Sequence, residues 1–115
     1  MKILLTTLNA KYVHSNLALR YLRSVCPGED IEIREYTIND RLDMVAGDIY
    51  KTGAEVIGFS CYIWNIEPTL ELVDIIRQAS PETVIVLGGP EVSYDPKECL
   101  RNGVDFLVDR FLNTV

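Results

Sequence analysis

Three short stretches of this sequence hold the polar, aromatic and glycine residues from which a binding site could be built. They are residues 8–16, 60–65 and 88–94. Hydroxyl and imidazole groups can hydrogen-bond a ligand or bind a metal, and glycines let another molecule approach the backbone closely. The candidate ligand-contacting residues from these stretches are Asn9, His14, Ser60, Cys61, Tyr62, Gly88, Gly89 and Pro90.

Each stretch also has a purely structural interpretation. Ser15 or Asn16 could cap a helix after a solvated loop, and a double glycine often forms a turn. Tyr62 and Trp64 could cover the end of the core, as buried aromatic residues commonly do. Cys61 has no histidine partner nearby in the sequence, which favours a buried, unreactive thiol.

The order of predicted elements decides where these stretches lie. Short apolar runs alternate with longer segments of helical spacing, which is typical of βαβ units in a parallel sheet. The alternating pattern of residues 31–36 favours a strand at the sheet edge. The sequence therefore predicts an α/β, flavodoxin-like, doubly wound fold with five parallel strands in the order 2-1-3-4-5 and three α/β/α layers. The predicted strands are 2–7, 31–36, 56–60, 83–87 and 104–108, and the predicted helices lie near 17–26, 42–52, 65–79 and 96–102.

In such sheets ligands bind beyond the carboxyl ends of the strands, where the connections diverge to opposite faces. The first and third strands flank this point in the order 2-1-3-4-5. The three chemically unusual stretches follow strands one, three and four, so we expect them to meet at one crevice.

Composition narrows the function classes further. The chain has 115 residues, of which 48% are hydrophobic and 24% charged, which suits one globular domain. A formal net charge of -6 argues against nucleic-acid and membrane partners. Cys26, Cys61 and Cys99 are odd in number and widely spaced, so we expect reduced thiols in a cytoplasmic protein, without a disulfide framework or a zinc or iron–sulfur site.

Three ligand classes with related architectures fit the sequence poorly. A phosphoacceptor receiver domain needs acidic residues after strand one and an aspartate at the end of strand three, where Thr6, Thr7 and Ser60 stand instead. A flavodoxin phosphate loop would need a glycine that residues 6–10 lack, and a Rossmann site needs a Gly-x-Gly-x-x-Gly motif.

The crevice stretches resemble the cobalamin-binding domain family. Its pattern is Asp-x-His-x-x-Gly after strand one, Ser-x-Leu after strand three and Gly-Gly after strand four. Ser60-Cys61-Tyr62 and Gly88-Gly89 match the last two, with tyrosine in place of leucine. The first motif is altered: Tyr12 stands for the aspartate and Leu17 for the glycine, and His14 alone is kept as a candidate lower ligand of cobalt. The resemblance implies that Ser60 hydrogen-bonds the nucleotide tail of cobalamin and that the glycines leave room for it.

A narrower resemblance extends over nearly the whole chain. Residues 17–22, 87–92 and 103–108 are similar to the cobalamin-binding domains that precede radical S-adenosylmethionine (SAM) domains, as in anaerobic magnesium-protoporphyrin monomethyl ester cyclase-like and Fe-S oxidoreductase-like proteins. The similarity ends after Val108, which predicts a cobalamin-binding-like domain over 1–108 and a truncated tail over 109–115. It implies a domain without catalysis of its own that presents cobalamin to a radical SAM domain of the same parent chain. S-adenosylmethionine and a four-iron cluster would then belong to the parent alone. The alternative is a cofactor-free docking or interaction module.

Overall fold

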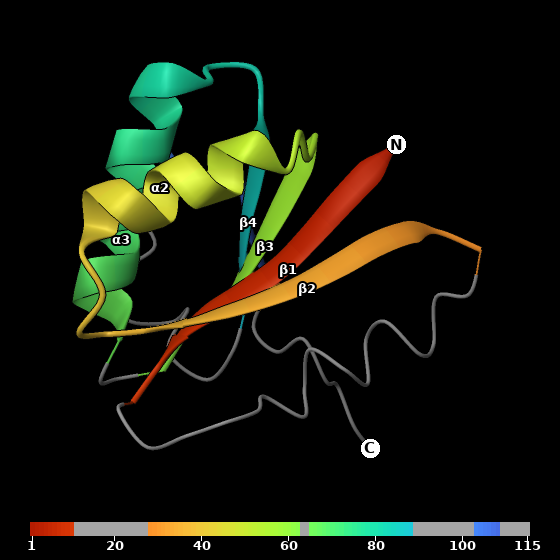
Figure 1. Ribbon diagram of the computed structural model, residues 1–115. Helices are drawn as coiled ribbons and strands as arrows, with labels where there is room; N and C mark the ends of the chain where they lie inside the picture. Colours follow the sequence, from red (N-terminus) through yellow and green to blue (C-terminus); the bar gives the residue numbers. More distant parts are fainter. Residues whose placement is uncertain (11–27, 63–64, 89–102, 109–115) are drawn as a thin grey trace.

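A parallel β-sheet forms the centre of the computed structural model, which describes residues 1–10, 28–62, 65–88 and 103–108 (Figure 1). Its strands lie in the order β2-β1-β3-β4-β5, and every pairing between neighbours is parallel. The strands are β1 (Lys2–Asn9), β2 (Asp30–Thr37), β3 (Val56–Ser60), β4 (Val84–Gly88) and β5 (Phe106–Val108). The predicted α/β parallel fold and the order 2-1-3-4 are confirmed, with β2 at an edge.

The last strand is shorter than the sequence predicts. β5 begins at Phe106, whereas the apolar pattern places its start at Val104. The reason is Asp105, whose carboxylate accepts a hydrogen bond of 2.8 Å from the backbone N–H of Ile85. The Asp105 carboxylate therefore accepts from the Ile85 N–H, which would otherwise donate to a backbone carbonyl of a longer β5.

Helices α2 (Leu42–Lys51) and α3 (Ile66–Ala79) both pack on one face of the sheet, as Figure 1 shows. Their buried residues recur every three or four positions, which is the pattern of a helix with one apolar face. Gly53, with φ +69°, follows α2 in the left-handed conformation that commonly ends helices. The helices predicted near 17–26 and 96–102 lie outside the described residues, and so does the second helical layer.

The main core lies between these two helices and the sheet. Alternate residues of the strands point into it, because side chains of a strand alternate between the two faces. Those from the three central strands are Leu4, Leu8, Ile57, Phe59, Ile85 and Leu87, and Cys61, just after β3, joins them.

Arg77 of α3 holds the segment from Gly103 to Phe106 in place by hydrogen bonds and an ion pair. The Arg77 guanidinium donates to the carbonyl oxygens of Gly103 (2.7 Å) and Thr83 (2.6 Å) and pairs with the Asp105 carboxylate at 2.6 Å. Gly103 has φ +97°, which favours glycine, and Val104 is buried. These residues fasten the amino ends of β4 and β5 to α3, at the end of the sheet opposite the predicted crevice.

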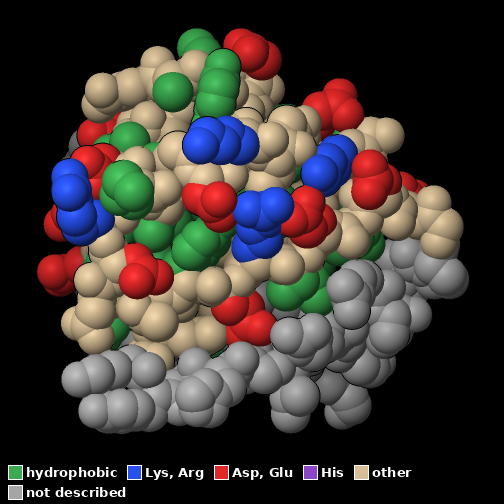
Figure 2. All heavy atoms as spheres, in the orientation of Figure 1, with side chains coloured by type: hydrophobic (Ala, Val, Ile, Leu, Met, Phe, Trp, Pro, Cys, Tyr) green, Lys and Arg blue, Asp and Glu red, His purple; other side chains and the backbone are tan. Residues whose placement is uncertain are grey.

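Charged side chains of both signs are interspersed on the face that carries α2 and β2 (Figure 2). Arg34 of β2 pairs with Glu32 and, at 2.9 Å, with Asp48 of α2, whose carboxylate also accepts a hydrogen bond from the Tyr36 hydroxyl. The hydrogen bonds from Tyr36 and Arg34 lower the pKa of Asp48. Burial and the Asp48 carboxylate raise the pKa of Tyr36.

No helix among the described residues is long and apolar enough to cross a membrane.

Candidate functional site

The sheet face opposite α2 and α3 carries a row of small and polar residues at the carboxyl ends of the strands. The register pairs Thr7 with Glu35 and Ser60 with Gly88, and the pairing of Thr6 with Phe59 brings Thr7 beside Ser60. We call Glu35, Thr7, Ser60 and Gly88 the polar row. Leu5 lies one step toward the amino end on the same face and is buried, yet it does not belong to the main core. The polar row is thus on the other side of the sheet from that core.

At the predicted crevice, the backbone pairing of β1 with β3 stops before either strand ends. Their register ends at Thr6 and Phe59, whereas β1 stays paired with β2 as far as Asn9, and β3 stays paired with β4 as far as Ser60. The separation of β1 and β3 lies where the crossover direction of the fold reverses. This is the position at which doubly wound sheets bind ligands.

Side chains bridge the two strands beyond their last pair. The Thr7 hydroxyl donates a buried hydrogen bond of 2.8 Å to the carbonyl oxygen of Ser60. The side-chain amide of Asn65, which has no exposed surface, donates to the carbonyl of Leu8 at 3.0 Å and to the carbonyl of Ser60 at 3.4 Å. Its oxygen accepts a bond of 2.7 Å from the backbone N–H of Tyr62. Asn65 therefore connects the end of β1, the end of β3 and the loop that follows.

The peptide group between Ser60 and Cys61 is fixed from both sides. Its carbonyl accepts from Thr7 and Asn65, as described, and its N–H donates to the carbonyl of Gly88 at 2.7 Å. Ser60 itself is only 2% exposed. Both polar groups of this peptide thus have partners, so the backbone that carries the Ser60 hydroxyl is held in one orientation.

Asn9 extends the polar row at the end of β1. It is buried, and its side-chain amide donates to the Glu35 carboxylate at 2.8 Å. The row and its extension therefore offer hydroxyl, amide and carboxylate groups beside glycine backbone. The hydroxyl and amide groups are neutral donors and acceptors that suit a ligand rich in amides and hydroxyls, and the Glu35 carboxylate accepts the hydrogen bond from Asn9.

The predicted site residues fall into three groups. Asn9, Ser60 and Gly88 lie together at the carboxyl edge of the sheet, as predicted. Cys61 lies in the main core, fully buried and on the other face, whereas Tyr62 is half-buried in the loop after β3. His14, Gly89 and Pro90 lie outside the described residues.

Thr7 and Asn65 are not among the residues that the sequence predicts to contact a ligand. From the sequence, Thr7 argues only against a receiver site, although a hydroxyl near the end of a buried strand is itself a signal of a polar site. Asn65 was placed at the start of a helix, where asparagine normally caps the helix. Its side chain makes no such cap bond and contacts β1 instead.

Within the described ranges, no group of three or more histidine, cysteine or acidic residues could hold a metal ion.

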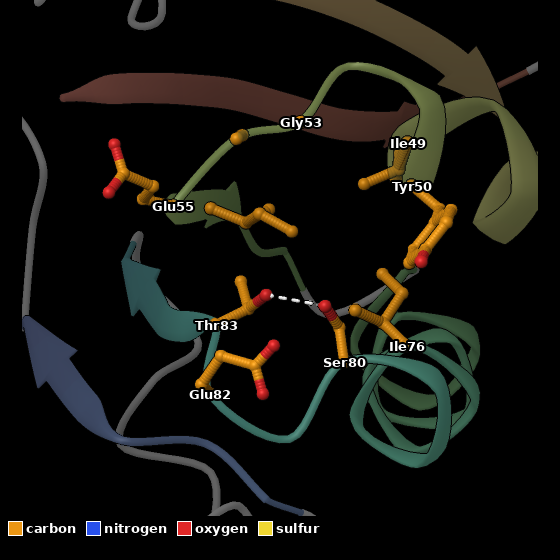
Figure 3. Close-up of a pocket in the computed structure, with 10 residues that line it drawn as sticks. Ile49, Tyr50, Gly53, Glu55, Ile76, Ser80, Glu82 and Thr83 are labelled. Atoms are coloured by element: carbon orange, nitrogen blue, oxygen red, sulfur yellow. Dashed lines mark hydrogen bonds between the residues drawn. The ribbon is translucent and has the colours of Figure 1, made fainter.

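A cavity of about 430 Å³ lies at the opposite, amino end of β3 and β4, between the carboxyl ends of α2 and α3 (Figure 3). Ile49, Tyr50 and Ile76 form its apolar wall, and Thr83 donates to the Ser80 hydroxyl at 2.9 Å within it. None of the predicted site residues lines this cavity, so it is separate from the predicted crevice.

Comparison with known proteins agrees with this geometry. The model of the B12 binding domain family matches residues 3–110, nearly the whole chain. The chain belongs to the B12-binding domain family. The first strand from Ile3 onward, the polar row and β5 of this B12-binding domain lie within the matched range.

Two curated relatives match part of the B12-binding domain. A 2-(S-pantetheinyl)-carbapenam-3-carboxylate methyltransferase from Streptantibioticus cattleyicolor is 28% identical over 72 residues, which are 63% of this chain and 10% of that protein. The cobalamin-dependent radical SAM methyltransferase TokK from Streptomyces tokunonensis is 31% identical over 42 residues, which are 36% of this chain and 6% of that protein. The matched segments span a tenth or less of these curated relatives.

Solved structures share the fold. A cobalamin-binding protein from Desulfitobacterium hafniense superimposes with a TM-score of 0.67 at 18% identity, covering 96% of this chain and 53% of that one. The response regulator domain of Thermotoga maritima CheB gives a TM-score of 0.63 at 14% identity, covering 96% of this chain and 81% of that one. Both likenesses concern the fold, whereas the acidic residues of a receiver site are replaced here by Thr6, Thr7 and Ser60.

Proposed function

We propose that this B12-binding domain holds cobalamin at the crevice between β1 and β3 and presents the corrin to a radical SAM domain. The observation that carries this proposal is the polar row, in which Thr7, Ser60 and Gly88 lie beside the Glu35 carboxylate at the point where β1 and β3 stop pairing. The family match supports the cofactor, and the methyltransferase relatives support the radical SAM partner.

The residues of the crevice fit the nucleotide tail of cobalamin. Gly88 has no side chain, so the backbone beside Ser60 carries no Cβ that would keep a ligand away. Ser60 supplies a short hydroxyl that can donate to or accept from the tail, and Asn9 supplies an amide at the same edge. Gly89, Pro90 and Tyr62 would extend this surface, and His14 is the proposed lower ligand of cobalt.

When bound, cobalamin would supply the methyl-transfer or electron-pair chemistry, and the protein would supply position and electrostatics. Ser60 and Asn9 would orient the tail by hydrogen bonds. Cys61 would contribute by packing in the main core. S-adenosylmethionine and a four-iron cluster would be held by the partner domain, and this domain would catalyse nothing by itself.

Retention of the cofactor tests the proposal. The protein is mixed with hydroxocobalamin and desalted, and the corrin absorbance that stays with it is measured at several concentrations. We expect wild type to retain cobalamin and Ser60→Ala to bind it about fivefold more weakly, the usual effect of one lost hydrogen bond. Ser80→Ala is the matched control, because its hydroxyl bonds Thr83 at the other end of the strands. Equal affinities of Ser60→Ala and wild type would remove Ser60 from the site.

A cofactor-free docking module is the second candidate. Met44 and Tyr50 of α2 are 66% and 62% exposed, and a partner protein could cover them. The same desalting experiment separates the two functions. Wild-type protein without retained corrin absorbance would favour docking.

A further inference from the structure

We propose that Thr7 and Asn65 are positioning residues of the cobalamin site, which hold the Ser60 hydroxyl in its binding orientation. We call them the Thr7–Asn65 pair. The inference rests on the proposed function and names two residues that the family motifs do not include. Its basis is the place where the pairing of β1 and β3 ends and side-chain bonds replace it.

A backbone ladder cannot hold Ser60 against β1. The last β1–β3 pair is Thr6 with Phe59, so the Ser60 carbonyl lies one residue beyond the register. Its partners toward β1 are the Thr7 hydroxyl at 2.8 Å and the Asn65 amide at 3.4 Å. On the other side, the N–H of the same peptide reaches Gly88 at 2.7 Å.

Loss of the β1-side bonds would free this peptide to rotate. The Ser60 Cα is one end of that peptide, so a reorientation that displaces this Cα would move the Ser60 hydroxyl as well. A buried carbonyl without a partner is also unfavourable, which gives the peptide a reason to reorient. The pair therefore acts on cobalamin through Ser60, without a contact of its own being required.

The neighbouring threonine provides a matched control within the same strand. Thr6 and Thr7 are both about 1% exposed, but their side chains point to opposite faces of the sheet. The Thr6 hydroxyl has no hydrogen-bond partner among the described residues, whereas the Thr7 hydroxyl donates to Ser60. Thr6→Val and Thr7→Val thus make the same chemical change at adjacent positions, but only Thr7→Val removes a hydrogen bond to Ser60.

The first readout needs no cofactor. In NMR spectra of the cobalamin-free protein, the Cys61 amide belongs to the peptide whose carbonyl Thr7 contacts. We expect Thr7→Val to shift the Cys61 amide resonance, and Thr7→Ser, which keeps the hydroxyl, to restore it. A Cys61 resonance that shifts no more in Thr7→Val than in Thr6→Val would overturn the positioning role.

The second readout is cobalamin affinity, measured by desalting. We expect Thr7→Val to weaken retention about fivefold, Thr6→Val to stay within about twofold of wild type, and Thr7→Ser to recover most of the affinity. In a Ser60→Ala background, Thr7→Val should have almost no further effect, because residues that act through one another are not additive.

The outcomes separate this inference from the function on which it rests. Failure of wild type to retain cobalamin overturns the proposed function, and the Cys61 resonance still decides whether Thr7 holds the peptide. Retention by wild type together with an undiminished Thr7→Val effect in the Ser60→Ala background overturns the inference alone.

Discussion

The two faces of the sheet have opposite chemistry although the same strands form both. In β1, Leu4 and Leu8 enter the main core beneath α2 and α3, whereas Thr7 and Asn9 belong to the polar side. The contrast continues in β3 and β4, where Phe59 and Leu87 pair on the core face and Ser60 and Gly88 pair on the other. One face supplies the main core, and the other carries the polar row at which we propose that cobalamin binds.

This division lets a small domain support a polar site without weakening its core. Apolar side chains concentrated on one face bury most of the surface that stabilises the fold. The polar row sits at the carboxyl edge, where the buried side chains of Thr7 and Asn65 bond backbone carbonyls and the Asn9 amide bonds the Glu35 carboxylate. Changes on the two faces should accordingly have separable effects on stability and on cobalamin binding.

The largest effect is expected on the core face. Ile85→Ala removes a fully buried side chain of β4 and should lower the free energy of unfolding by about 2–5 kcal/mol, measured by urea denaturation. Val86→Ala, the next residue on the other face, is the control and should cost less than half as much, because Val86 is half-buried. Equal losses would show that the two faces contribute equally to stability.

Gly88→Val should act mainly on cobalamin affinity, in contrast to Ile85→Ala, which should act mainly on stability. Gly88 lies within β4, where a β-branched residue is readily accommodated by the backbone. The added side chain would occupy the space beside Ser60, so we expect cobalamin affinity to fall about tenfold or more, equivalent to about 1.4 kcal/mol. The measurement is corrin retention after desalting, with a cooperative urea transition as the check that the variant is folded.

Gly47→Ala is the control for that substitution. Gly47 lies in α2, where an added Cβ meets nothing within 4 Å. Its cobalamin affinity should equal that of wild type. An equal loss in both variants would mean that Gly88 has no special place in the site.

The smallest effect is expected at Asp48, which joins α2 to the edge strand β2. Its carboxylate is about half exposed, so Asp48→Asn should lower the free energy of unfolding by about 1 kcal/mol or less. Because the fold lowers the pKa of Asp48, this stabilisation is present above its usual pKa of 3.8 and is lost as the pH falls through the folded value.

Urea transitions at pH 7 and near pH 3 check the Asp48 prediction. The difference between Asp48→Asn and wild type should shrink at the lower pH, and cobalamin retention at pH 7 should not change. A difference that grows on acidification would contradict the assignment.

Much of the fold could be predicted from patterns along the chain. The continuous apolar run of residues 56–60 predicted β3 with its observed bounds, because a strand covered on both faces needs such a run. β5 was predicted two residues too long, since an apolar pattern does not reveal that the Asp105 carboxylate replaces a ladder bond.

The site could be predicted less completely, because its bonds join residues far apart in sequence. Ser60 and Gly88 were found by motif and by their position at strand ends. The Thr7–Ser60 bond spans 53 positions, and the Asn65–Leu8 bond spans 57, so only the three-dimensional register brings these groups together. Gly103 and Asp105 show the opposite case, a recognisable motif whose described contacts with Arg77 fasten the sheet.

The early end of the β1–β3 register has a consequence for how this binding site can diversify. Beyond Thr6 and Phe59, the distance between the two strands depends on the side chains at positions 7 and 65 and on no backbone ladder. Single substitutions there can widen or narrow the crevice while every ladder bond of the sheet stays intact. The spacing of these two strand ends can therefore evolve, or be engineered, independently of the sheet that carries them.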